Sequence, residues 1–130
     1  MALKELEKLN NIFAEYPEIK LVYFFGSRAE GNEGPLSDFD FAFYADEKDR
    51  KKLFSLKLAL MERVSLLLRT DKVDISVLNL IEGPELKYFI IKNGKLIFER
   101  EPFKVIVEPR ILSEYFDFHT QLSHHNLTGA

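Results

Sequence analysis

The chain has 130 residues, a formal net charge of −3 and no cysteine. This length fits one domain with an ordinary hydrophobic core, and the missing cysteines exclude disulfides, thiolate metal sites and cysteine catalysis. The basic face of a nucleic-acid-binding protein is not expected, no apolar run is long enough to span a bilayer, and the N-terminus is too charged for a signal peptide. We therefore expect a cytoplasmic protein that binds no membrane and no nucleic acid directly.

The first third of the chain predicts one helix and two strands. Apolar residues at helical spacing predict an amphipathic helix over residues 2–15. The aromatic and β-branched run KLVYFF predicts a strand over 20–25. The segment GSRAEG, 26–31, indicates a turn that opens a short helix, followed by a loop at NEGP. A second strand is predicted over 38–45.

A long helix and a third strand are expected next. Asp46 is expected to cap a helix over residues 47–69. Its packing face is expected from helical spacing at Phe54, Leu58, Met61, Ser65 and Leu68. The alternating segment DKVDISVLN predicts a strand over 71–79.

The last part of the chain predicts a short helix, a strand and a final helix. Pro84 at the first helical position and the pair Asn93-Gly94 mark the two ends of the short helix. A fourth strand is predicted over 95–100 and a last helix over 103–118. The sequence therefore predicts an α/β (α+β) domain over residues 1–118, with a small mixed sheet of about four strands and helices packed on it. Residues 119–130 are expected to form a flexible tail, in which His119, His124 and His125 are solvated.

Two carboxylates lie in an otherwise apolar strand. Side chains alternate between the faces of a strand, so Asp38 and Asp40 share one face and the phenylalanines between them face the core. Like charges this close repel, unless a cation such as Mg²⁺ lies between them and also binds substrate phosphates. Asp74 is a further lone acid in the third predicted strand. If the two strands are neighbours, three carboxylates converge on a site for divalent metals and a phosphoryl group.

The turn upstream of these acids fits the same chemistry. A strand that ends in Gly26-Ser27 and enters a helix presents unpaired backbone N–H groups, which bind phosphate. Gly26 lacks a Cβ, so a phosphate can approach its backbone. The Ser27 hydroxyl can donate to a phosphate oxygen, and the guanidinium of Arg28 can bind another.

These motifs resemble those of a known family. Gly26-Ser27, a gap of ten residues and then Asp-Phe-Asp at 38–40 are similar to the signature of the DNA polymerase β-like nucleotidyltransferases. With Asp74 and the segment GPELKYFIIKNGKLIFERE, the chain looks like the minimal nucleotidyltransferases (MNT), which are antitoxins of HEPN/MNT toxin–antitoxin pairs. The resemblance covers residues 5–118 and implies the polymerase β-like nucleotidyltransferase fold.

The resemblance also implies an activity and residue roles. The expected reaction transfers AMP from ATP to a tyrosine hydroxyl of a partner HEPN toxin, with Mg²⁺ as cofactor. Asp38, Asp40 and Asp74 would be the catalytic and metal-binding residues, and Gly26, Ser27 and Arg28 would bind the phosphates of ATP. The chain departs from many relatives at Glu30, where they carry arginine.

Two other functions stay open at this point. One is an antitoxin whose site is weak or inactive and which neutralises its partner by binding, as Glu30 suggests. The other is a nucleotidyltransferase for small molecules of the aminoglycoside type. Such relatives carry an additional substrate-binding domain, for which the remaining residues are too few. The sequence is compatible with an oligomer.

Overall fold

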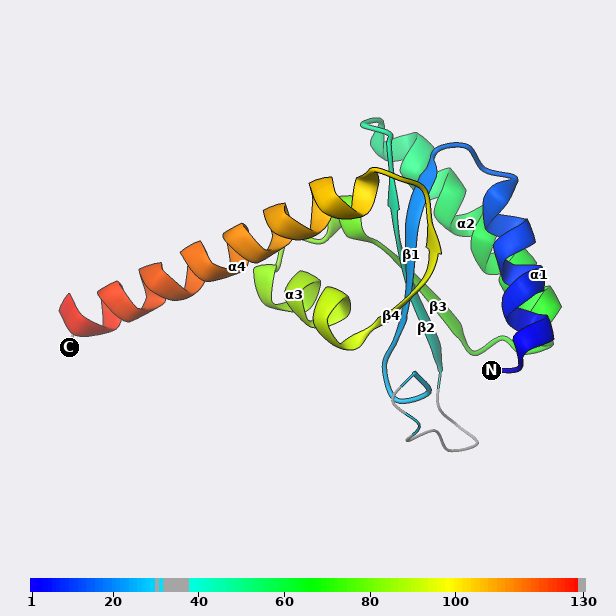
Figure 1. Cartoon of the computed structure of the whole chain (residues 1–130), viewed down its shortest axis with the longest axis horizontal. Coiled ribbons are helices and arrows are strands. Elements are labelled where there is room, and N and C mark those ends of the chain that lie inside the picture. The colour runs from blue at the N-terminus through cyan, green and yellow to red at the C-terminus, as the bar shows by residue number, and fades with distance from the viewer. Residues whose placement is uncertain (30, 32–37, 129–130) are drawn as a thin grey trace.

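The computed structural model describes residues 1–29, 31 and 38–128, with side chains through residue 123. Four strands form one mixed sheet (Figure 1) in the order β3-β2-β1-β4. Their bounds are β1 Ile19–Phe25, β2 Phe39–Ala45, β3 Val73–Val77 and β4 Lys95–Glu99. β1 runs antiparallel to β2 and β4, whereas β2 and β3 are parallel. The helices are α1 Leu3–Ala14, α2 Arg50–Leu68, α3 Pro84–Asn93 and α4 Phe103–Thr128, with a 3₁₀ helix at Leu78–Leu80.

The sheet lies between two layers of helices. Figure 1 shows α1 and α2 on one face of the sheet and α3 and α4 on the other. The α1/α2 face buries the larger core, which combines aliphatic side chains of both helices with phenylalanines of the strands. The α3/α4 face buries a smaller cluster of Leu21, Tyr23, Ala42, Leu78, Ile90, Val107 and Ile111. The structure thus confirms the prediction of a mixed four-stranded sheet with helices packed on it.

A polar contact attaches α4 to the sheet. The hydroxyl of Tyr23 in β1 donates a hydrogen bond to the carboxylate of Glu108 in α4. Burial and the neighbouring carboxylates of Glu108 and Glu99 raise the pKa of Tyr23 far above its usual value. The phenol is therefore un-ionised at every physiological pH, and it remains a hydrogen-bond donor to α4.

Most predicted elements agree with the structure within one or two residues. The first helix, the first two strands, the helix from Pro84 to Asn93 and the fourth strand are confirmed. The third strand is shorter than predicted, because residues after Val77 enter the 3₁₀ helix. The short helix predicted after Gly26 is wrong for the described residues, since Ser27 to Ala29 form a turn.

The prediction for α2 was wrong in its start and only partly right in its packing face, of which Met61 and Leu68 do pack against the core. The cap is Asp49, whose side chain accepts from the backbone N–H of Lys51, and not Asp46. Leu53, Leu60 and Val64 are the buried residues of the helix, whereas Phe54 and Leu58 of the predicted face are exposed. Apolar residues surround much of this helix, so its sequence alone does not identify the side that meets the sheet.

The last helix is longer than predicted. A helix that ends at 118 was expected, but α4 continues to Thr128 and its second half runs beyond the sheet (Figure 1). Within it, the ring of His119 lies 4.3 Å from that of Tyr115, and its Nε2 lies 3.6 Å from Glu85 of α3. His119 is therefore a helical residue that contacts α3, while its side chain stays exposed to solvent as predicted. The side chains of His124 and His125 lie outside the described residues. The domain boundary at 118 stays a prediction.

Candidate active site

The sheet register places two of the predicted acids side by side, and the third lies just before one of their two strands. Asp40 of β2 is the direct partner of Asp74 in the parallel strand β3, and Asp38 lies immediately before β2. Phe39, Phe41 and Phe43 pack into the core on the α1/α2 face. The acids therefore project from the α3/α4 face, as predicted from the alternation.

This corner of the α3/α4 face is not covered by the helices. Ala42, two residues after Asp40, is fully buried in the cluster that α3 and α4 cover. Asp40 is only half-buried, and Asp38 and Asp74 are exposed. A substrate can therefore reach the carboxylates, while the rest of the same strand stays packed.

The three carboxylates repel one another. Burial raises the pKa of Asp40 above its usual value, and the charges of Asp74 and then Asp38 raise it further. No cationic group contributes an opposing effect on Asp40. Burial and the two neighbouring negative charges thus act on Asp40 in the same direction, and a bound cation would relieve the repulsion.

The donor set fits a magnesium ion that also binds a substrate. In the described part of the chain, no three His, Asp or Glu side chains are gathered closely enough to hold a metal ion by themselves. Mg²⁺ rarely needs such a cage, because it takes one or two carboxylates and completes its coordination with water and substrate phosphates. Neighbouring carboxylates that share an open corner match this requirement.

Gly26 lies against Asp40 in a backbone conformation that favours glycine. Its φ of +85° lies in the left-handed region, and a Cβ added there would lie 2.3 Å from Oδ2 of Asp40. Phe25, the residue before it, is the direct partner of Asp40 in the β1–β2 pair. From the sequence, the missing Cβ is expected to let a phosphate approach the backbone. The structure adds that the missing Cβ makes room for the Asp40 carboxylate itself.

The rest of the turn is only partly as expected. Ser27 follows Gly26 in the turn and is half-buried. The guanidinium of Arg28, however, lies over the ring of Phe39, 4.1 Å from its centroid. Phe39 packs with the core of the α1/α2 face, so Arg28 lies on the opposite side of β2 from Asp40. Glu30 and most of the ten-residue gap lie outside the described residues.

One residue of this corner was missed by the sequence analysis. The backbone oxygen of Lys72 accepts from the N–H of Phe39 at 2.8 Å, so Lys72 lies next to Asp38 at the entrance of β3. Val73 is buried on the α1/α2 face. Strand alternation could therefore have predicted that Lys72, the residue before it, lies on the face of the acids.

Acids at the β2–β3 corner of an open mixed sheet, with a glycine turn after β1, suit an enzyme that transfers a nucleotidyl group from a nucleoside triphosphate. The chain belongs to the family described as "Polymerase beta, Nucleotidyltransferase", whose model matches residues 7–103. It is also 32% identical over 104 residues to the protein adenylyltransferase MntA of Aphanizomenon flos-aquae (strain 2012/KM1/D3), which covers 75% of this chain and 69% of the relative.

Solved structures share the fold over the full chain. A crystal structure of a toxin–antitoxin with AMP-PNP has a TM-score of 0.74 at 20% identity and covers 100% of both chains. A structure of the tri-AMPylated Shewanella oneidensis HEPN toxin in complex with MNT antitoxin has a TM-score of 0.72 at 18% identity, also over 100% of both chains. At these identities the likeness establishes the fold. Among the described residues, no helix has the length and apolar character needed to cross a membrane.

Proposed function

We propose that this chain is a Mg²⁺-dependent protein adenylyltransferase that transfers AMP from ATP to a tyrosine hydroxyl of a HEPN toxin, and so acts as its antitoxin. The observation that carries the proposal is the open corner where Asp40 lies beside Asp74 and against Gly26. The adenylyltransferase relative and the fold shared with antitoxins of HEPN toxins support the choice of reaction and partner. The cytoplasm remains the expected location.

The residues of the corner have distinct proposed roles. Asp38 and Asp40 would hold Mg²⁺, which neutralises charge on the triphosphate when bound. Asp74, on the outer strand β3, would complete the metal site and accept the proton of the acceptor hydroxyl. Gly26 and Ser27 would bind the β- and γ-phosphates through backbone N–H groups and the hydroxyl. Arg28 stays a proposed phosphate ligand, and its guanidinium lies over the ring of Phe39.

Catalysis by such a site depends on position and charge. The reacting hydroxyl attacks the α-phosphorus in line with the departing pyrophosphate, so the protein has little covalent chemistry to perform. The fixed register of β2 and β3 holds the carboxylates in place before the substrate arrives. This preorganisation avoids rearrangement during the reaction.

The proposal is tested by transfer of labelled AMP to a HEPN toxin. We expect the wild-type chain to label the toxin in the presence of Mg²⁺ and ATP, and Asp40→Asn to reduce the rate by about 10²–10³-fold, the usual cost of losing one group that stabilises a transition state. Asp46→Asn is the matched control, because Asp46 is exposed at the opposite end of the same strand. Toxin neutralised without any labelling, and equally well by Asp40→Asn, would instead support an antitoxin that acts by binding alone.

A further inference from the structure

We propose that Lys72 is a further catalytic residue of this site, whose ammonium contacts the acceptor oxygen and stabilises the negative charge that forms on it during attack. The inference rests on the proposed adenylyl transfer and adds a group on the acceptor side, where the sequence motifs assign only Asp74.

Backbone pairing fixes where Lys72 lies. The hydrogen bond from Phe39 N–H to the Lys72 oxygen extends the β2–β3 ladder by one residue, and Phe39 is the partner of Val73. Val73 is 6% exposed and packs on the α1/α2 face. Strand alternation therefore directs Lys72 to the same face as Asp74. The backbone N–H of Lys72 donates to the Thr70 hydroxyl at 3.1 Å, which further fixes the chain at this point.

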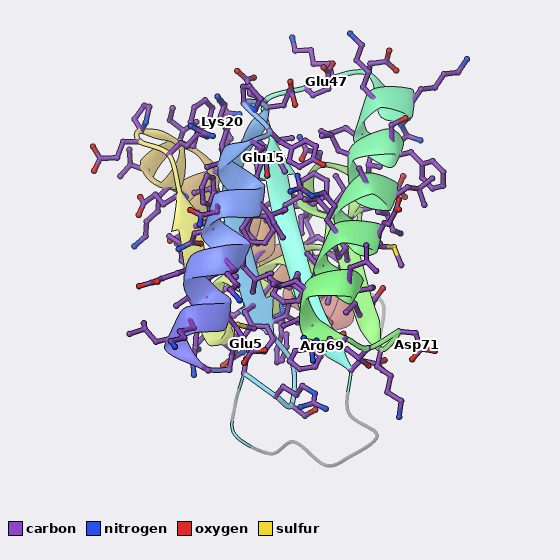
Figure 2. The ribbon with its side chains drawn as sticks, turned by 90° about the vertical axis from the view of Figure 1, so that its right-hand side faces the viewer. Glu5, Glu15, Lys20, Glu47, Arg69 and Asp71 are labelled. Carbon is purple, nitrogen blue, oxygen red and sulfur yellow. The ribbon has the colours of Figure 1, made fainter. Side chains whose placement is uncertain are left out.

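The ammonium of Lys72 is available to a ligand. The side chain is half-buried, yet within the described part of the chain it forms no hydrogen bond or ion pair. Asp38 and Asp74 are the acids nearest in the register, and neither is joined to it in an ion pair. The other charged residues of this connection, Arg69 and Asp71, are exposed at the end of α2 (Figure 2). A lysine whose backbone adjoins the acidic corner, and whose side chain is bound to none of the acids, is suited to contact a substrate.

Sheet order places Lys72 on the side from which the acceptor must arrive. The strands follow the order β3-β2-β1, and the phosphate-binding turn at Gly26-Ser27 follows β1. Pyrophosphate therefore leaves on the β1 side of Asp40. Because attack is in line with the leaving group, the acceptor hydroxyl approaches from the β3 side. Asp74 and Lys72 are the charged residues of β3 and its entrance on that face.

A cation is useful there for a chemical reason. The acceptor phenol has a pKa of about 10, far above that of a carboxylate, so Asp74 alone is a weak base for it. A positive charge within contact distance lowers the pKa of an acid by about 1–3 units. In the reaction, the phenolic oxygen forms the bond to the α-phosphorus and its proton passes to Asp74. The bond from the α-phosphorus to the bridging oxygen breaks, and pyrophosphate leaves with that electron pair.

The test compares Lys72→Met and Lys72→Arg with Lys52→Met, a control at the exposed start of α2. With a HEPN toxin and Mg²⁺·ATP, we expect Lys72→Met to lower kcat by about 100-fold with the KM for ATP and the melting temperature unchanged. Lys72→Arg should recover part of the rate, because the charge is retained. Lys52→Met should behave as the wild type.

A more acidic acceptor separates this role from a structural one. In a toxin whose tyrosines are replaced by fluorotyrosine, the phenol is more acidic and depends less on a nearby cation. The decrease in kcat caused by Lys72→Met should therefore be smaller. An equal loss with both toxins, or no loss with either, would overturn the role of Lys72 while leaving adenylyl transfer intact. A wild-type chain that labels no toxin would overturn the proposed function itself, and the inference with it.

Discussion

The two faces of strand β2 differ in how completely they are covered. On the α1/α2 face, Phe41 and Phe43 are 2% and 1% exposed and pack against both helices. On the α3/α4 face, Ala42 is buried but Asp40, two residues earlier, is half-exposed beside another acid. On one face of β2 the apolar side chains are buried under helices. On the other face the helices cover Ala42 but leave the start of the strand partly exposed.

The phenylalanine face of β2 therefore stabilises the fold, whereas the opposite face carries the carboxylates of the proposed active site. The phenylalanine side fixes where β2 lies, because large buried rings tolerate little movement. The opposite side can then carry mutually repelling carboxylates at the end that no helix covers. Substitutions on the two faces should therefore have different effects.

The largest effect on stability is expected on the covered face. Phe41→Ala removes a fully buried ring that packs at 5.1 Å from the ring of Phe24, and it should lower the free energy of unfolding by about 3–5 kcal/mol. Urea denaturation followed by circular dichroism measures this loss. A loss below about 1 kcal/mol would show that the ring is not part of a tightly packed core.

Gly26→Ala should lower both the stability of the fold and the rate of AMP transfer. A left-handed alanine costs about 1–2 kcal/mol, and its Cβ would displace the Asp40 carboxylate. We therefore expect reduced stability together with strongly reduced AMP transfer. Gly83→Ala is the control, since its Cβ would meet nothing within 4 Å. Normal activity in Gly26→Ala would mean that the close contact with Asp40 does not matter for the reaction.

A moderate effect is expected where α4 joins the sheet. Tyr23→Phe removes the hydrogen bond to Glu108 without changing the shape of the core, and should cost about 1–2 kcal/mol. Thermal melting measures the change, and AMP transfer at a temperature well below the transition should remain. A loss of activity without a loss of stability would link α4 to the acidic corner.

The smallest effect is a gain in stability. Because the pKa of Asp40 is raised in the folded chain, the folded state binds more protons than the unfolded state between the two pKa values. The free energy of unfolding therefore falls as the pH rises through this window. Asp40→Asn removes the charge, so it should melt slightly above the wild type at pH 7. The difference should decrease as the pH approaches 4, and a variant that melts lower at pH 7 would contradict the repulsion.

Local patterns were sufficient for most of the fold and for the acids. Alternation of phenylalanine and aspartate in β2 identified both faces, and Pro84 and Asn93 marked the ends of α3. Patterns failed where several surfaces were equally apolar, as in α2. They also did not reveal that the guanidinium of Arg28 lies over the ring of Phe39. The register that joins Asp40 to Asp74 could be stated only as a condition, because strand order is a property of the whole chain.

That register has a consequence for folding. β1 and β2 form an antiparallel pair, whereas β3 joins β2 in parallel only after the chain has passed through the whole of α2. Pairings between distant segments form slowly, because the loop between them must first be closed. A chain that has folded only its first two strands holds Gly26 and Asp40 but lacks Asp74. Catalytic competence thus requires the long-range β2–β3 pairing as well as the local β1–β2 pair, so an incompletely folded molecule would hold only part of the site.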